Sequence, residues 1–282
     1  MAFRPPNTPS LDVEIVRWTR ARHNALADPV VTEEPLEIRV RSGLEAAYAT
    51  LAITMRTPGD DVELAVGFMY GEGLLRERAD LLEAAPCTTT TNVVNLTVRP
   101  DLDLTTATQS RRFYTTSSCG LCGRSSLDAV AAALKGRRVE GERPIGGSTL
   151  TALPGLLRAR QTVFQATGGL HGCALFDGGG QLLAVREDVG RHNAVDKLVG
   201  RAFLDDALPA TDRILVLSGR AGFELIQKAV MAGISVVAAV GAPTSLAVEL
   251  ARTSGQTLVG FLSPDRFNVY AGASRILLDG GA

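Results

Sequence analysis

Two cysteines, Cys119 and Cys122, are the residues of this chain best suited to covalent chemistry. Each is followed by glycine, which has no Cβ, so the backbone can turn sharply and a bulky partner can approach both sulfurs. Arg124 adds a positive charge beside the pair, and residues 125–128 have the Ser-x-x-acid pattern of a helix start. Because a nearby cation and a helix N-terminus both favour a thiolate, the stretch predicts reactive or metal-binding sulfur.

A structural zinc site and a dithiol redox site are two alternatives for this pair. A closed zinc site needs four ligands, and no second Cys-x-x-Cys is present. A thioredoxin-type pair expects a preceding strand and a following long helix, a context that is only half present here. The other candidate ligands are dispersed along the chain, at His23, Cys87, His171, Cys173 and His192.

Deaminase chemistry is excluded by the same residues. A zinc deaminase needs His-x-Glu and Pro-Cys-x-x-Cys, but none of the three histidines is followed by x-Glu, and Ser118 precedes the first cysteine. Two further cysteines, Cys87 and Cys173, lie in threonine-rich or apolar segments, so we expect both to be buried and unreactive.

Composition limits the class of protein. A chain of 282 residues, 45% hydrophobic and 21% charged, can bury the core of one large or two smaller domains. The net charge of −1 argues against broad electrostatic binding to nucleic acid or to a membrane. Neither a signal-peptide core nor an apolar run of about 20 residues is present, so we expect a cytoplasmic protein with reduced thiols.

The first half of the chain predicts a small α+β domain over residues 11–115, after a proline-rich mobile segment at 1–10. Alternating apolar and β-branched residues predict its strands, and Pro58-Gly59-Asp60 predicts a turn before a helix. Residues 99–118 have no strong period and predict a linker into the cysteine loop at 116–125. The predicted strands span 36–40, 48–55 and 88–98. One helix is predicted to begin at Asp60 or Asp61, and a second short helix is predicted from about 76 to 85.

The second half, residues 126–282, predicts an α/β domain with a mostly parallel sheet covered on both faces. Its apolar runs alternate with amphipathic helices, the pattern of strand-to-helix units. Residues 177–180, Asp-Gly-Gly-Gly, predict a hairpin turn between two of its strands. Two helices are expected over 126–134 and 154–165, and three further helices are expected to end near Leu204, Met231 and Ser254. The expected strands span 171–176, 181–185, 214–217, 234–240 and 257–261.

Loops at the carboxyl ends of such strands share one edge of the sheet, where ligands bind. Helix N-termini and arginines at this edge would form an anion site, such as for a nucleotide phosphate. No segment matches the phosphate-loop or dinucleotide fingerprint. Glu187 and Asp188 are expected to orient the arginines. The residues expected at this edge are Arg191, His192, Ser218, Gly219, Arg220, residues 241–244 and Arg266.

Three motifs occur in this order: Cys-Gly-Leu-Cys-Gly at 119–123, Glu-Asp-Val-Gly-Arg-His-Asn-Ala-Val-Asp-Lys at 187–197 and Ser-Gly-Arg-Ala-Gly-Phe-Glu at 218–224. Together they resemble the FdhD family of formate dehydrogenase accessory sulfurtransferases. The resemblance begins near residue 30 and implies a second domain with the cytidine deaminase fold. It also implies an enzyme that moves persulfide sulfur from a cysteine desulfurase to the molybdenum (or tungsten) bis-pterin guanine dinucleotide cofactor. That sulfuration would precede insertion of the cofactor into formate dehydrogenase.

Carried onto this sequence, the resemblance makes Cys119 the persulfide carrier, while Cys122 either resolves the persulfide or shields it. The predicted helix start at Ser125 lies nearer Cys122, so local electrostatics alone would favour Cys122 as the thiol of lower pKa. The resemblance implies no permanently bound metal. It places the guanine dinucleotide at Phe261, Leu262, Ser263, Pro264, Asp265 and Arg266.

Two questions stay open at the level of sequence. A chaperone that binds the molybdenum cofactor without transferring sulfur would be an alternative function. Such a protein would tolerate loss of the cysteine pair. A homodimer is the default expectation for the assembly, because symmetric association is common.

Overall fold

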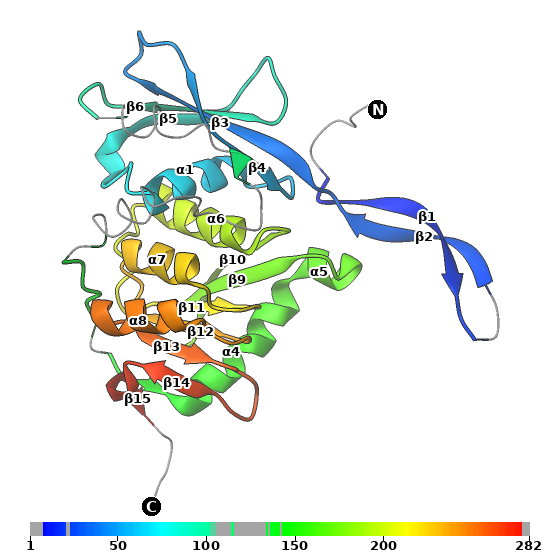
Figure 1. The fold of residues 1–282 in the computed structure, drawn as a ribbon, viewed down its shortest axis with the longest axis vertical. Helices are drawn as coiled ribbons and strands as arrows, with labels where there is room; N and C mark the ends of the chain where they lie inside the picture. The colour runs from blue at the N-terminus through cyan, green and yellow to red at the C-terminus, as the bar shows by residue number, and fades with distance from the viewer. Residues whose placement is uncertain are drawn as a thin grey trace, which may run out of the picture.

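The structure is a computed structural model that describes residues 8–20, 23–102, 104, 114–115, 134, 136–141 and 143–277. The cysteine pair and, apart from Leu134, the helix predicted at 126–134 lie outside these ranges. Figure 1 shows two sheets separated by helices, with a two-stranded ribbon extending from the body. Within the described ranges, no helix combines the length and the apolar character needed to cross a bilayer.

The first half of the chain forms the ribbon and a five-stranded sheet in the order β5-β6-β3-β4-β7. Alternating burial along β3 places its apolar residues on the face that meets the core, as the period-two pattern predicts. The strands are β1 (Ser10–Trp18), β2 (His23–Val31), β3 (Glu34–Ser42), β4 (Ala49–Arg56), β5 (Leu81–Pro86), β6 (Val93–Val98) and β7 (Tyr114–Thr115).

The helix predicted over residues 76–85 is wrong. Only a short 3-10 turn, η1 (Arg78–Asp80), forms there, and the chain then enters β5. Asp80 closes this turn by accepting hydrogen bonds from the backbone N–H groups of Arg76 and Glu77 at 2.7 and 3.2 Å. The following residues pair with β6, so ladder hydrogen bonds to a distant strand outweigh local helix propensity. The strand predicted from residue 88 begins only at Val93.

The second sheet has six strands in the order β10-β9-β11-β12-β13-β14. Its centre, β11 to β13, is parallel, but β9, β10 and β14 run antiparallel to their neighbours. The predicted mostly parallel sheet is therefore corrected to a mixed one. A tight hairpin joins β9 to β10, and β14 follows β13 without a crossover helix, so neither connection can produce a parallel pair. The strands are β9 (His171–Phe176), β10 (Leu182–Asp188), β11 (Ile214–Leu217), β12 (Val236–Ala239), β13 (Thr257–Gly260) and β14 (Asn268–Ala271).

Helices cover both faces of this sheet. Leu150, Leu153 and Leu157 of α4 pack on one face, and α6, α7 and α8 lie on the other (Figure 1). The helix predicted from residue 154 starts earlier and breaks at Gln161, because burial of these leucines extends it across Pro154. The ends predicted for the last three helices are confirmed. The elements are α1 (Asp61–Gly71), α4 (Gly147–Arg160), α5 (Thr162–Thr167), α6 (Arg191–Leu204), α7 (Phe223–Met231), α8 (Ser245–Ser254), β8 (Ile145–Gly146), η2 (Ala273–Arg275) and β15 (Ile276–Leu277).

The two sheets share one core through α1 and α6. A Cβ added to Gly67 would overlap the carbonyl oxygen of Asp196, and one added to Gly200 would overlap that of Glu63. The two helix backbones therefore touch, which only glycine permits. One hydrophobic cluster runs from the first sheet through these helices into the second.

Because of this contact, protein stability should depend strongly on the absence of a side chain at Gly200. Replacing Gly200 with alanine is expected to lower the free energy of unfolding by about 3 kcal/mol, because two backbones must separate to admit one methyl group. Urea unfolding measures this change. The matched control is Gly155→Ala in α4, where a new Cβ meets no atom within 4 Å and stability should stay level or rise. Equal midpoints for the two variants would contradict the proposed contact.

Candidate functional site

Several loops meet at one edge of the six-stranded sheet. The parallel strands β11, β12 and β13 end there, and the antiparallel β9 begins there, since Leu217 pairs with Cys173. The register of β9 and β10 sets Asp188 opposite His171 at the same edge. The edge thus carries the loops expected from the sequence, at 189–192, 218–220, 241–244 and 261–266.

Backbone hydrogen bonds join three of these loops into one surface. Gly241 N–H donates to the Gly219 oxygen at 3.0 Å, and Phe261 N–H donates to the Gly241 oxygen at 3.1 Å. A Cβ on Gly241 would lie 2.9 Å from the Arg220 nitrogen. The loops therefore approach closely because residue 241 is glycine.

A buried ion pair fixes the start of α6. Asp188, fully buried, accepts from Lys197 Nζ at 2.8 Å, from Gly190 N–H at 2.8 Å and from Asn193 Nδ2 at 3.0 Å. Lys197 Nζ also donates to the Thr57 oxygen at 2.9 Å, which links this loop to the chain leaving β4. This network was not predicted from the sequence, in which the i, i+4 spacing of Asn193 and Lys197 on one helix face is the available signal.

Glu187 and Asp188 do not orient the arginines, contrary to the sequence-based expectation. Glu187 accepts hydrogen bonds from the backbone N–H groups of Val163 and Phe164 at 3.2 and 2.9 Å, at the start of α5. Among the described residues, no ion pair joins either carboxylate to Arg191 or Arg220. Both acids instead hold backbone segments in place.

Positive side chains gather where these loops meet. His192 Nε2 lies 2.9 Å from a Glu224 carboxylate oxygen, which connects the first turns of α6 and α7. His171 is half-buried nearby. Burial lowers the pKa of His171, and the charges of Arg191, His192 and Arg220 lower it further. With two helix N-termini at the same place, this edge has the charge expected of an anion site.

The loop after β13 presents an aromatic ring. Phe261 is 45% exposed, and its φ of 53° lies in the left-handed region that non-glycine residues rarely adopt. Such strain often accompanies ligand sites. Leu262, 1% exposed, belongs to the core, so a ligand at this edge could meet only its backbone. Ser263 and Arg266 close the loop through backbone and hydroxyl hydrogen bonds.

Residues 31–277 match the profile of the FdhD/NarQ family. The chain belongs to this family. The sulfur carrier protein FdhD of Streptomyces coelicolor is 52% identical over 280 residues, covering 94% of this chain and 95% of that protein. The protein of the same name from Mycobacterium tuberculosis is 47% identical over 274 residues, covering 91% and 97% of the two chains. The resemblance inferred from the three motifs is thereby confirmed.

A solved structure supports the fold of this FdhD/NarQ chain. The crystal structure of a protein described as a formate dehydrogenase accessory protein, from Desulfotalea psychrophila, matches with a TM-score of 0.74. The match covers 96% of this chain and 100% of that chain at 22% identity. It supports a mixed α/β fold, while the cytidine-deaminase-like character of the second half stays a prediction.

The two described cysteines differ, and the expectation that both are buried is wrong for Cys87. Cys173 is buried in β9, where its thiol donates to the Ala194 oxygen at 3.1 Å and burial raises its pKa. Cys87 follows the end of β5 and is partly exposed. Hydrogen bonds from the Thr89 side chain and backbone lower the pKa of Cys87 to about 7.

Alkylation should separate these two thiols. With iodoacetamide at pH 7, Cys87 is expected to react in the native protein because about half of it is ionised there. Cys173 should react only after denaturation, since its sulfur is buried. Peptide mass spectrometry measures both, with Cys87→Ser as the control. Native labelling of Cys173 at the rate of Cys87 would refute the assignment.

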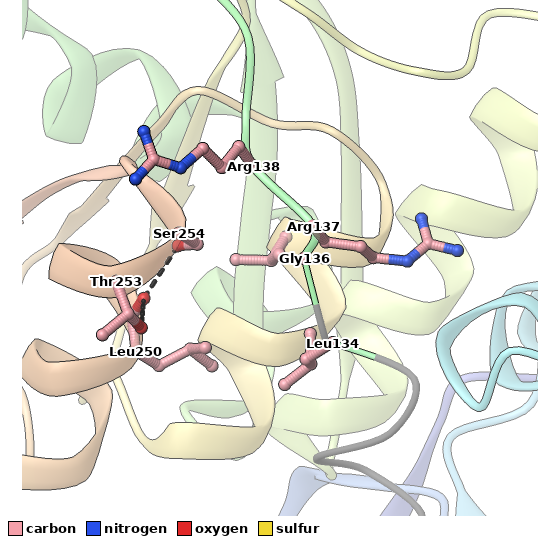
Figure 2. Close-up of a pocket in the computed structure, with 8 residues that line it drawn as sticks. Leu134, Gly136, Arg137, Arg138, Leu250, Thr253 and Ser254 are labelled. Carbon is pink, nitrogen blue, oxygen red and sulfur yellow. Dashed lines mark hydrogen bonds between the residues drawn. The ribbon is translucent and has the colours of Figure 1, made fainter.

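A separate pocket lies at the opposite edge of the sheet, near the C-terminal ends of α7 and α8. Its volume is about 210 Å³. Figure 2 shows the guanidinium groups of Arg137 and Arg138 pointing in opposite directions, so they do not converge on one ligand. None of the predicted site residues lines it, and no group of three metal-ligating side chains occurs in the described part of the chain. The lining residues are Leu134, Gly136, Arg137, Arg138, Val230, Leu250, Thr253 and Ser254.

Proposed function

We propose that this chain carries sulfur as a persulfide on Cys119 and transfers it to the molybdenum bis(molybdopterin guanine dinucleotide) cofactor before formate dehydrogenase receives that cofactor. The observation that carries the proposal is the family match over residues 31–277, which spans both the cysteine pair and the cationic sheet edge. Relatives named sulfur carrier protein, and a solved structure described as a formate dehydrogenase accessory protein, support the same role.

The loading step is a thiol exchange with a cysteine desulfurase. The Cys119 thiolate attacks the outer sulfur of the desulfurase persulfide, a new S–S bond forms, and the desulfurase thiolate leaves. One sulfur atom changes carrier without net oxidation. Cys122 then either attacks Cys119, releasing hydrosulfide to the metal and leaving a Cys119–Cys122 disulfide, or shields the persulfide until it reacts.

The short distance along the chain from β7 to Cys119 supports delivery at the sheet edge. β7 pairs with β4, with Thr115 opposite Thr54, and the Thr54 hydroxyl donates to Asn193 Oδ1 at 3.3 Å in the first turn of α6. Cys119 is four positions after Thr115 in the sequence, so the two Cα atoms are at most about 14 Å apart. That span is compatible with a carrier sulfur near a ligand bound at the start of α6.

The edge itself suits the nucleotide end of the cofactor. The N-termini of α6 and α7, together with Arg191, His192 and Arg220, would hold phosphate groups. The exposed ring of Phe261 offers an apolar surface for a guanine base. The cofactor is a substrate here, and the proposal needs no permanently bound metal.

The proposed partners are a cysteine desulfurase, which supplies the sulfur, and the catalytic subunit of formate dehydrogenase, which receives the cofactor. We place the transfer in the cytoplasm, because thiols stay reduced there. A homodimer stays the default assembly.

A cofactor-binding chaperone without sulfur transfer is the second candidate. The cationic edge favours it, because anion binding at that edge does not depend on the cysteines. The two candidates differ in whether Cys119 ever bears an additional sulfur atom.

Peptide mass spectrometry after incubation with a cysteine desulfurase and cysteine tests the proposal. The Cys87→Ser variant is the protein to use, because the exposed Cys87 thiol could take up sulfur unspecifically. We expect one added sulfur on the peptide that contains Cys119. Addition on Cys122 alone would keep the function and reverse the two roles. No added sulfur on either, with the cofactor still bound, would support the chaperone.

A further inference from the structure

His171 occupies the centre of the cationic edge. It begins β9, and its strand neighbour Gly172 exchanges hydrogen bonds with Ser218, whose Oγ accepts at 2.9 Å and whose N–H donates at 3.0 Å. The His171 Nδ1 atom lies 3.4 Å from the point where a Cβ on Gly219 would stand. The imidazole therefore lies against the backbone of the loop that carries Arg220.

The imidazole has no protein partner among the residues that the structure describes. A neutral imidazole has one donor and one acceptor nitrogen, and a half-buried ring usually uses at least one of them. His192, the other histidine at this edge, already has its partner in Glu224. Asp188, opposite His171 in the strand register, is engaged with Lys197. His171, at the end of β9 that lies on this edge, thus keeps hydrogen-bonding capacity for a ligand.

The charges around His171 define what that ligand must be. Arg191 and His192 approach from α6, and Arg220 approaches from the loop after β11. Asp188 of β10 is the acidic group near it, and its charge is compensated by Lys197. Burial and these cations lower the pKa of His171 below its usual 6.5, so the ring is neutral at pH 7 in the free protein. The surrounding positive charges of Arg191, His192 and Arg220 favour an anion as the ligand at this position.

We propose that His171 is a phosphate-binding residue of this edge. When a phosphate group binds next to His171, Arg191 and Arg220, the His171 imidazole takes up a proton. This inference rests on the cofactor site proposed above and deepens it. A bound dianion reverses the sign of the local potential, so the protonated ring is favoured and donates to the phosphate oxygen. Because the liganded ring holds its proton to higher pH than the free ring, affinity must rise as pH falls through that interval.

Histidine NMR tests this directly, because the chain has only three histidines. The Cε1–H resonances are followed from pH 5 to pH 9, first without ligand, then with sulfate and then with GDP. Sulfate stays dianionic over this range, so it isolates protonation of the protein from that of the ligand. His171→Gln assigns the resonance, and His23, exposed on the ribbon, serves as the internal control.

We expect saturating sulfate to move the His171 midpoint upward by about one pH unit, which corresponds to a tenfold increase in affinity on protonation. The His171→Gln variant should bind sulfate about tenfold more weakly at pH 6, with a smaller loss at pH 8. GDP should produce the same midpoint change, and His23 should not respond.

Two results would overturn the inference. If sulfate or GDP shifts the His192 resonance while the His171 midpoint stays in place, His171 is no ligand, but the edge site and the proposed function stand. If millimolar sulfate and GDP leave every edge resonance unchanged, the inference and the cofactor site both fail. Persulfide formation on Cys119 would still be decided separately by mass spectrometry.

Discussion

Replacing Cys119 with alanine is expected to reduce formate dehydrogenase activation to the background of a strain that lacks the protein. The proposed relay has one carrier sulfur, so its removal leaves no group to hold the transferred atom. Loss of a covalent nucleophile commonly costs far more than about a hundredfold in rate. Formate-dependent dye reduction in a complemented deletion strain measures the effect.

Two controls make this result specific. Cys87→Ala removes the exposed thiol outside the proposed relay and should leave activation unchanged. GDP binding by Cys119→Ala should match that of the unaltered protein, since none of the proposed nucleotide contacts involves a cysteine thiol. Full activation by Cys119→Ala would reject the persulfide role and favour the chaperone.

Replacing Lys197 with methionine is expected to destabilise the protein by about 3 to 5 kcal/mol, because the fully buried Asp188 carboxylate loses its countercharge. The Thr57 oxygen loses a donor at the same time. The edge should weaken as well, because the same pair holds the loop that leads to Arg191. Urea unfolding and GDP affinity are the two measurements.

The matched control is Arg201→Met in the same helix. Arg201 is half-exposed and pairs with Asp205 at 2.6 Å, so its loss should cost at most about 1 kcal/mol. The double variant Asp188→Asn with Lys197→Met removes both charges and should recover part of the stability, since no unpaired ion then stays buried. If Lys197→Met costs no more than Arg201→Met, the ion pair does not hold this edge together.

Local sequence signals determined much of the second half of the protein. Asp177 and the glycines after it predict the β9–β10 turn, and in the structure Asp177 Oδ1 accepts from the N–H groups of Gly179 and Gln181 at 2.9 Å. The ends of α6, α7 and α8 follow from apolar periodicity and from the glycines between elements. These features depend on neighbours within a few residues, so the sequence suffices. The family could likewise be inferred from three contiguous motifs.

Only the tertiary structure decided the features that depend on distant partners. Residues 81–86 form a strand because β6 offers a hydrogen-bonding edge, although their local pattern suits a helix. Lys197 bonds to the Thr57 oxygen across 140 positions of sequence, a contact that no local pattern predicts. His171 likewise lacks any motif, and its cationic surroundings arise only when β9 runs antiparallel to β11. Periodicity encodes which face of an element is apolar, but the pairing of strands and buried charges depends on which elements meet in three dimensions.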